Sequence, residues 1–307
     1  MINQEYLEEA KRTGEAWAKS DAERDAKVVD PEGIRICKDI AYTDSASEDE
    51  KTWHLMDLYY PEGAAPKQGF PVIVSIHGGG WFYGDKELYR HYCLKLASYG
   101  YAVVNFNYRL SPMYPYPAGF MDVCALMDHL ERQKETYELD MTNLFGVGDS
   151  AGAQLLSQYC VWATSSKYRE LLPQGKHLKA PVPKKVALNC GIYNMRDMHD
   201  RENLCKWYLT EETFDDTKET LDLSKSFYAI LDYVNSDFPE TYLMLSVNDP
   251  LKVHTTPMKE KLEACAVPVT YREWGEGVPA DGHVFHLNMF SENGQKCNDE
   301  EIAFFQR

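Results

Sequence analysis

A serine flanked by glycines is the first group in this chain with clear chemical potential. The sequence Gly-Asp-Ser-Ala-Gly occupies residues 148–152, after an apolar run that ends at Val147 and before a helical pattern of apolar residues. A nucleophilic serine needs a turn tight enough to push its hydroxyl out of the backbone, so the flanking positions must be small. The strand, turn and helix context therefore predicts a nucleophile elbow with Ser150 as the attacking group.

Three consecutive glycines follow a second predicted strand upstream of the serine. Residues 71–76 form a short β-branched run, and His-Gly-Gly-Gly-Trp follows at 77–81. Backbone N–H groups of such a loop can approach a carbonyl oxygen closely and donate to the oxyanion that forms when a serine attacks it. A flexible turn is the structural alternative, but the downstream serine motif favours an oxyanion hole.

These motifs together resemble the hormone-sensitive-lipase-like branch of the α/β-hydrolases, which includes bacterial acetyl esterases. Between the glycine loop and the serine motif, Asn-Tyr-Arg-Leu-Ser-Pro at 107–112 and Tyr-Pro-Ala at 116–118 resemble that branch's Tyr-Arg-Leu-Ala-Pro-Glu and Phe-Pro-Ala segments. The resemblance is firm over residues 70–161 and weaker to the C-terminus, and the first fifty residues carry none. It implies an α/β-hydrolase fold and an ester hydrolase.

The resemblance also implies which backbone groups form the oxyanion hole. These are the N–H groups of Gly79 and Gly80, joined by that of Ala151 after the nucleophile. The chain departs from the family pattern at Met113, where glutamate is common, and at Ala153, where a third glycine often follows the elbow. These departures leave the catalytic groups in place and bear on the subfamily and substrate range.

A catalytic serine needs a histidine to take its proton and a carboxylate to orient that histidine. In an α/β-hydrolase the chain order is serine, acid, histidine, each on a loop at the carboxyl end of a strand. Asp249 lies directly after the predicted strand 241–247, whereas Asp232 and Asp237 precede that strand and would lie at its other end. Asp249 is therefore the predicted acid, with a plain turn residue as the alternative.

Three histidines downstream of the acid are candidates for the base. His254 falls in a predicted helix only five residues after Asp249, which leaves no strand between them. His283 follows the last predicted strand in a glycine-rich loop, and His-Val-Phe at 283–285 resembles the family's His-Gly-Phe. His286 would start from the next turn of the chain, so we predict His283 as the base.

The elements that position these groups alternate between strand and helix, which is typical of a parallel sheet covered on both faces. An antiparallel hairpin is predicted first, at 34–41 and 54–60. Strands are then predicted at 71–76, 101–106, 143–147, 185–191, 241–247 and 267–274, and helices at 85–98, 120–132, 151–163, 253–266 and 299–305. Asn298 with Glu301 three residues later predicts a capping box for the last helix.

Two segments fall outside this alternation and divide the predicted domains. Residues 1–33 contain a charged helical pattern over 6–26, and residues 192–238 are charged, aromatic and too long for a simple connection. By the resemblance they form a small helical cap, as an N-terminal segment and an insertion. The α/β-hydrolase core is then 34–191 and 239–307.

The composition limits the class of protein and its partners. A formal net charge of −16 argues against nucleic acid and anionic membranes as partners, because both would repel the chain. The eight cysteines are scattered without a C-x-x-C pair, and no metal-ligand spacing is present, so no metal or cofactor is predicted. With no apolar run for a signal peptide or span, the protein is expected in the cytoplasm. A homodimer is left open.

The favoured function is a serine carboxylesterase acting on short-chain acyl esters, acetyl to butyryl by the resemblance, through an acyl-enzyme. The nearest alternatives use the same machinery on another bond, as an arylformamidase or a peptidase does. A small-molecule receptor built on an inactive hydrolase is the alternative from another class. Receptors of that kind typically lose the histidine, so the presence of all three groups argues against it.

Overall fold

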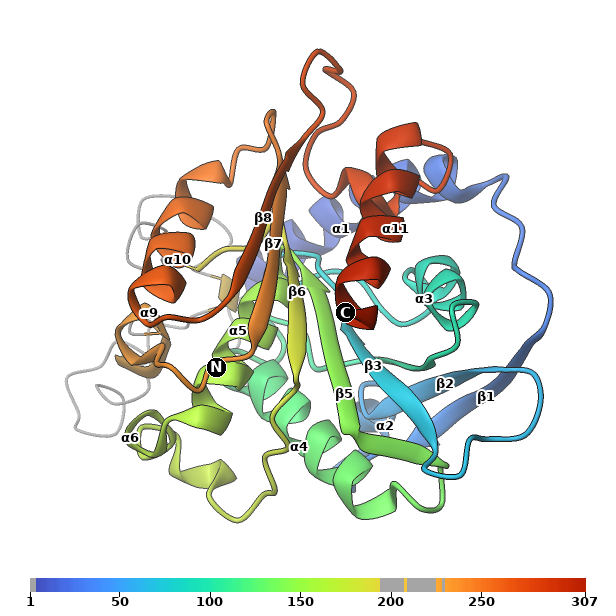
Figure 1. Cartoon of the computed structure of the whole chain (residues 1–307). Coiled ribbons are helices and arrows are strands. Elements are labelled where there is room, and N and C mark those ends of the chain that lie inside the picture. The colour runs from blue at the N-terminus through green and yellow to red at the C-terminus, as the bar shows by residue number, and fades with distance from the viewer. Residues whose placement is uncertain (1–3, 194–206, 209–224, 228–229) are drawn as a thin grey trace.

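The computed structural model describes residues 4–193, 207–208, 225–227 and 230–307, which contain an eight-stranded sheet (Figure 1). The strand order is β1-β2-β4-β3-β5-β6-β7-β8. The strands are β1 (Ile34–Ala41), β2 (Leu55–Pro61), β3 (Phe70–Ile76), β4 (Ala102–Phe106), β5 (Leu139–Asp149), β6 (Lys185–Asn189), β7 (Glu240–Ser246) and β8 (Val269–Trp274). The pairs β1/β2 and β2/β4 are antiparallel, and the other neighbouring pairs are parallel. The predicted hairpin and mostly parallel sheet are confirmed.

Helices cover both faces of this sheet, as the alternation predicts. In Figure 1, α4, α5 and α10 lie on one side of the sheet, and α3 and α11 lie on the other. The described helices are α1 (Gln4–Asp25), α2 (Glu48–Lys51), α3 (Arg90–Ala97), α4 (Ala118–Gln133), α5 (Ala151–Thr164), α6 (Ser166–Arg169), α9 (Ile230–Tyr233), α10 (Lys252–Ala264) and α11 (Glu292–Gln306).

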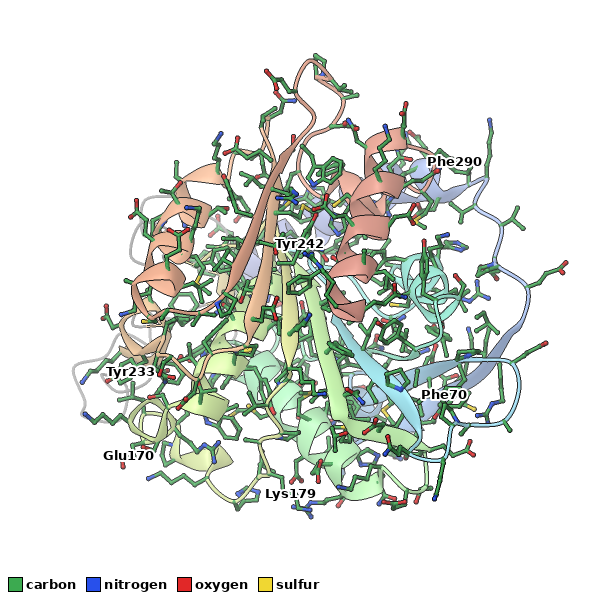
Figure 2. All side chains as sticks on the ribbon, in the orientation of Figure 1. Phe70, Glu170, Lys179, Tyr233, Tyr242 and Phe290 are labelled. Atoms are coloured by element: carbon green, nitrogen blue, oxygen red, sulfur yellow. The ribbon has the colours of Figure 1, made fainter. Side chains whose placement is uncertain are left out.

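Two hydrophobic cores result from the alternation of side chains along the strands. On β3, Val72 and Ile76 pack beneath α4 and α5, whereas Ile73 packs beneath α3. Figure 2 shows the side chains that fill the space on both sides of the sheet, with Tyr242 of β7 near α11, where its ring lies 5.8 Å from that of Phe304. Burial on both faces explains why the central strands are continuous apolar runs.

Some predicted boundaries are wrong. The helix predicted at 85–98 begins only at Arg90, because the Asp85 carboxylate accepts a hydrogen bond from Leu88 N–H and the intervening residues form turns. The strand predicted at 143–147 is longer, since β5 begins at Leu139 and continues to the serine turn.

The terminal helix predicted at 299–305 is present, but its predicted start and its capping box are wrong. Helix α11 begins at Glu292, and the Ser291 hydroxyl caps it by accepting a hydrogen bond from Gly294 N–H at 3.2 Å. Asn298 and Glu301 instead lie inside the helix and are buried.

The side chains of Asn298 and Glu301, which have the spacing of a capping box, make hydrogen bonds to other segments of the fold. Asn298 Nδ2 donates to the backbone oxygen of His286 at 2.9 Å. The Glu301 carboxylate accepts from the Tyr92 hydroxyl and from Asn189 Nδ2, each at 2.7 Å. A buried polar side chain needs a hydrogen-bond partner, and these two find theirs outside the helix. The same spacing of asparagine and glutamate can therefore occur inside a helix as well as at its start.

The predicted cap segments are described to different extents. The helix predicted in the first 33 residues is present as α1. The predicted insertion at 192–238 lies mostly outside the described residues, so its separation from the core stays a prediction. Most aromatic side chains within its described part are buried, namely Tyr193, Trp207, Tyr208, Phe227 and Phe238, whereas Tyr233 is half-buried.

Seven of the eight cysteines lie in the described part of the chain, and all seven are free thiols. Most of them are buried, where a thiol acts as a small apolar side chain. Cys205 lies outside the described residues. None of the helices in the described ranges is long and apolar enough to span a bilayer.

Candidate active site

Ser150 lies in the turn between β5 and α5, as the elbow motif predicts. Its φ of 51° is in the left-handed region, which is strained for a residue with a side chain, and its N–H donates to Asn189 O at 2.9 Å. A Cβ on Gly152 would lie 2.0 Å from Ile76 O, so α5 can begin this close to β3 only with glycine there. Gly152 of the motif is therefore needed for the close approach of α5 to β3 that holds Ser150 in this turn.

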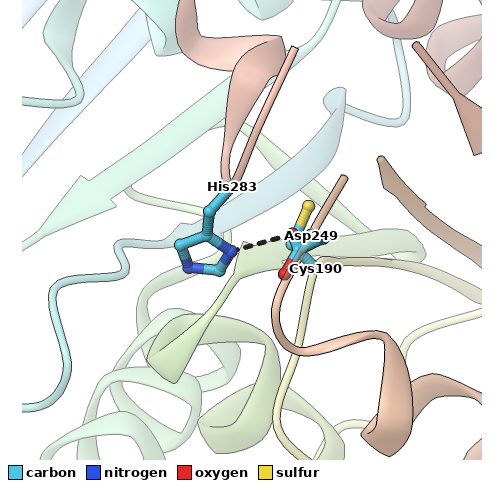
Figure 3. Close-up of side chains that lie close together, drawn as sticks. All are labelled: Cys190, Asp249 and His283. Atoms are coloured by element: carbon cyan, nitrogen blue, oxygen red, sulfur yellow. Dashed lines mark hydrogen bonds and ion pairs between the residues drawn. The ribbon is translucent and has the colours of Figure 1, made fainter. Parts of the chain in front are cut away.

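The structure brings Ser150, His283 and Asp249 together in a hydrogen-bonded chain. His283 Nε2 lies 3.0 Å from Ser150 Oγ, and His283 Nδ1 lies 2.9 Å from Asp249 Oδ2. Asp249 follows β7 and His283 lies in the loop after β8, so neighbouring parallel strands deliver the two groups to one edge (Figure 3). This arrangement can remove the serine proton and charge-compensate the resulting imidazolium.

The electrostatics keep the acid ionised. The Asp249 side chain is fully buried, which by itself would raise its pKa, but the hydrogen bond and charge of His283 and the N–H of Leu251 lower that pKa below its ordinary value. The His283 side chain remains 32% exposed, so it can exchange protons with substrate or water. A carboxylate that stays charged at neutral pH fixes the imidazole as an Nδ1–H donor.

Cys190 lies beside the acid and histidine, as Figure 3 shows. One ligand atom from each of these three residues lies within 4.8 Å of the others, a spacing that could hold a metal ion. However, Asp249 and His283 are already joined by a direct hydrogen bond, and the other nitrogen of His283 contacts Ser150. These hydrogen bonds account for the close spacing of the acid and the histidine.

The competing residues lie elsewhere. His286 is fully buried near the ring of Tyr92, and burial lowers its pKa to about 3, so it is neutral at neutral pH. His254 is buried within α10. Asp232 lies in α9, and Asp237 lies before β7, at the opposite end of that strand from Asp249.

The glycine loop at 77–81 follows β3 and lies beside the serine turn. His77 Nδ1 donates to Gly78 O at 2.7 Å, and burial lowers the pKa of His77 to about 4, which keeps its ring neutral. Within the described ranges, the N–H groups of Gly79, Gly80 and Ala151 donate to no other group. They are therefore available to an oxyanion.

A cavity of about 400 Å³ opens onto the serine and histidine. Its lining is mostly apolar, and α1 forms one wall. The described lining residues are Trp17, Ser20, Asp21, Arg24, Gly78, Gly79, Gly80, Tyr83, Leu88, Tyr89, Asp149, Ser150, Ile192, Pro250, Leu251, His283, Val284 and Leu287. A mostly apolar cavity next to a nucleophile is suited to an uncharged acyl group.

Two features of the α1 wall were missed by sequence reasoning. Arg24 reaches the cavity, where its guanidinium is neutralised by ion pairs with Asp21 and Asp25 at 2.8 and 2.6 Å. The Tyr83 hydroxyl donates to Asp21 at 2.8 Å and so connects α1 to the turn after the glycine loop. The ion pairs of Arg24 are local to α1, but no short-range pattern signals that Arg24 lines the cavity or that Asp21 contacts Tyr83, because both depend on how α1 packs against the core.

The fold and the hydrogen-bonded serine, histidine and aspartate are those of an α/β-hydrolase. A family model described as the alpha/beta hydrolase fold matches residues 73–287, more than two thirds of the chain. The chain therefore belongs to the α/β-hydrolase family. Its predicted resemblance to the hormone-sensitive-lipase-like branch and to bacterial acetyl esterases is confirmed.

Several known proteins are similar to this chain. An acetyl esterase of Salmonella schwarzengrund (strain CVM19633) is 23% identical over 258 residues, which cover 81% of this chain and 74% of that protein. Esterase B of Lactobacillus rhamnosis, solved with a C4-C4 tributyrin phosphonate inhibitor, aligns with a TM-score of 0.85 and 26% identity over 100% of this chain and 96% of that one. A bacterial heroin esterase (TM-score 0.70, 22% identity, covering 94% and 90%) shares the fold.

Proposed function

We propose that this esterase of the α/β-hydrolase fold hydrolyses short-chain acyl esters, acetyl to butyryl, through an acyl-enzyme on Ser150. The observation that carries the proposal is the continuous chain from Asp249 Oδ2 through His283 to Ser150 Oγ, with contacts of 2.9 and 3.0 Å. Both distances are within reach for proton transfer without any rearrangement.

The reaction proceeds in two halves. In the first, Ser150 Oγ attacks the ester carbonyl while His283 Nε2 takes its proton, and the N–H groups of Gly79, Gly80 and Ala151 stabilise the oxyanion. His283 then gives that proton to the departing alcohol as the carbon–oxygen bond breaks. In the second half, His283 deprotonates a water molecule that attacks the acyl-serine, and it returns that proton to Ser150 Oγ as the acid is released.

The preference for short acyl groups is supported by the size of the cavity and by the relatives. Each methylene buried in an apolar pocket contributes about 0.8 kcal/mol, so binding improves with chain length until the wall is reached. The α1 wall, which includes Trp17, limits the length of acyl chain that a cavity of about 400 Å³ accepts. The similarity to an acetyl esterase and to an esterase bound by a tributyrin phosphonate supports the same range.

The experiment is a measurement of kcat/KM on p-nitrophenyl esters with acyl chains from two to twelve carbons. We expect a maximum between two and four carbons and a steep decline beyond. Ser150→Ala is the matched control, because it removes only the nucleophilic oxygen. A maximum at the long end would instead indicate a lipase-like groove, and activity on N-formylarylamides or peptides above that on esters would favour the alternative hydrolases.

A further inference from the structure

We propose that Tyr89 is a positioning residue that ties the oxyanion loop to the turn carrying the nucleophile. It does so through a buried relay that runs from Gly78 N–H to the Tyr89 hydroxyl and on to the carboxylate of Asp149. The inference rests on the proposed function, since it concerns how the oxyanion hole is held against Ser150.

The relay consists of two short hydrogen bonds. Gly78 N–H donates to the Tyr89 hydroxyl at 2.9 Å, and that hydroxyl donates to Asp149 Oδ2 at 2.7 Å. Tyr89 and Asp149 are 4% and 3% exposed, so water does not compete freely for either bond. Asp149 directly precedes Ser150, and Gly78 directly precedes Gly79, so the relay joins the two halves of the reacting site.

The direction of both bonds is fixed by the chemistry of the partners. Burial raises the pKa of Asp149 to about 6, while the Tyr89 hydrogen bond and the charges of His283 and Arg24 act in the opposite direction. At neutral pH the carboxylate is therefore ionised and can only accept. The hydroxyl proton of Tyr89 must then point at Asp149, which leaves its lone pairs for Gly78 N–H.

Two successive peptide groups of the loop are held by side chains. In the first, His77 O accepts from the Tyr108 hydroxyl at 2.9 Å and Gly78 N–H binds Tyr89. In the second, Gly78 O accepts from the His77 ring, so the Gly79 N–H of that same planar group points the opposite way. Tyr89 thus holds the peptide immediately before the proposed oxyanion donor.

The side chains of the relay pack closely against Gly78 and leave no space for a larger residue there. A Cβ at this position would lie 2.6 Å from Asp149 Oδ2 and 3.0 Å from the Tyr89 hydroxyl. The first glycine of the loop is therefore small because the carboxylate and hydroxyl occupy the volume next to it. The need for glycine at the start of the glycine loop therefore follows in part from the side chain of Asp149 in the serine motif.

The test is Tyr89→Phe, which removes the hydroxyl and keeps the ring. Tyr59→Phe is a matched control, because the buried Tyr59 hydroxyl likewise accepts from Asn105 Nδ2 and donates to the buried Asp57 carboxylate, at 3.4 and 3.1 Å. For p-nitrophenyl acetate we expect Tyr89→Phe to lower kcat about 10- to 100-fold with KM within about threefold, because a displaced oxyanion donor acts on the transition state. Tyr59→Phe should change both constants less than about threefold.

A second variant tests whether the two side chains act as one unit. Asp149→Asn should also lower kcat. The kcat of the double variant Tyr89→Phe/Asp149→Asn should be no more than about threefold below that of the less active single variant. If Tyr89→Phe does not yield folded protein by circular dichroism, Asp149→Asn with Tyr89 intact carries the same kcat test. Unchanged kcat in the folded variant, a loss equal to that of Tyr59→Phe, or additive losses in the double variant would overturn the relay.

The same experiment separates failure of the relay from failure of the proposed function. If wild-type protein hydrolyses the ester and Ser150→Ala does not, the proposed function stands, and an active Tyr89→Phe removes only the relay. If Ser150→Ala retains wild-type turnover, the serine mechanism itself is wrong, and the relay is overturned with it.

Discussion

The floor and the α1 wall of the cavity are built in different ways. The floor comprises the serine turn, the glycine loop and the two loops that carry Asp249 and His283, all at the carboxyl ends of parallel strands. Helix α1 has Ala10 as its buried residue and contacts the turn after the glycine loop through single side chains, such as Trp17 on Phe82 and Asp21 on Tyr83. Chemistry that needs fixed geometry is thus placed on rigid elements, and we infer that selectivity is placed on a less deeply anchored helix.

The largest effect should come from the histidine of the floor. His283→Ala removes the group between acid and nucleophile, and in a comparable triad such a loss lowers kcat on the order of 10⁶-fold. His286→Ala should lower kcat less than about tenfold, because its buried ring lies near Tyr92 and not in the hydrogen-bonded chain. Steady-state kinetics on p-nitrophenyl acetate distinguishes the two. Reversed phenotypes would move the base to His286.

An effect of intermediate size should appear in stability rather than activity. Burial lowers the pKa of His286 to about 3, with His283 and Arg24 acting in the same direction and Asp249 in the opposite one, so the unfolded chain binds a proton between pH 3 and 6.5 that the folded protein does not. The free energy of unfolding of the wild-type protein therefore decreases as the pH is lowered through this window.

His286→Ala lacks that proton uptake. The variant loses packing at every pH, but its deficit in the free energy of unfolding should shrink by about 2 kcal/mol between pH 7 and pH 5. Urea unfolding at the two pH values measures it. A deficit that stays constant would mean that His286 is not held neutral by burial.

The smallest effect should come from the α1 wall. Trp17 packs on Phe82 and Tyr83, with ring centroids 4.9 and 5.8 Å away, and lines the cavity. Trp17→Ala should leave kcat for the acetyl ester within about threefold but move the optimum of kcat/KM toward longer chains by one or two methylenes, each contributing about 0.8 kcal/mol when buried. A uniform loss of kcat/KM across all chain lengths would mean that Trp17 supports the catalytic floor and does not limit the length of the acyl chain.

The floor could be predicted from the sequence because its requirements are local. Gly152 and the three glycines after β3 follow from close backbone approach, and chain order places Asp249 after one strand and His283 after the next. The structure brings His283 within hydrogen-bonding distance of both Ser150 and Asp249. The mostly parallel sheet could be predicted for the same reason, since strands buried on both faces are continuous apolar runs.

Other parts could not be predicted, because they depend on contacts between distant segments. The wrong capping box shows this most clearly: Asn298 and Glu301 have the spacing of a cap, but buried partners use both side chains. The Tyr89 relay and the contact of Asp21 with Tyr83 are likewise set by packing. Residues of this kind carry no local pattern that separates them from surface polar residues.

The most direct test of the account is the covalent step. The protein is treated with a chromogenic p-nitrophenyl alkylphosphonate, and the adduct is located by intact mass and peptide mapping. The account predicts one p-nitrophenol released per chain, a single adduct on Ser150 and complete loss of ester hydrolysis, with no adduct on Ser150→Ala. An adduct on another residue with Ser150 unmodified, or undiminished hydrolysis by Ser150→Ala, would contradict it.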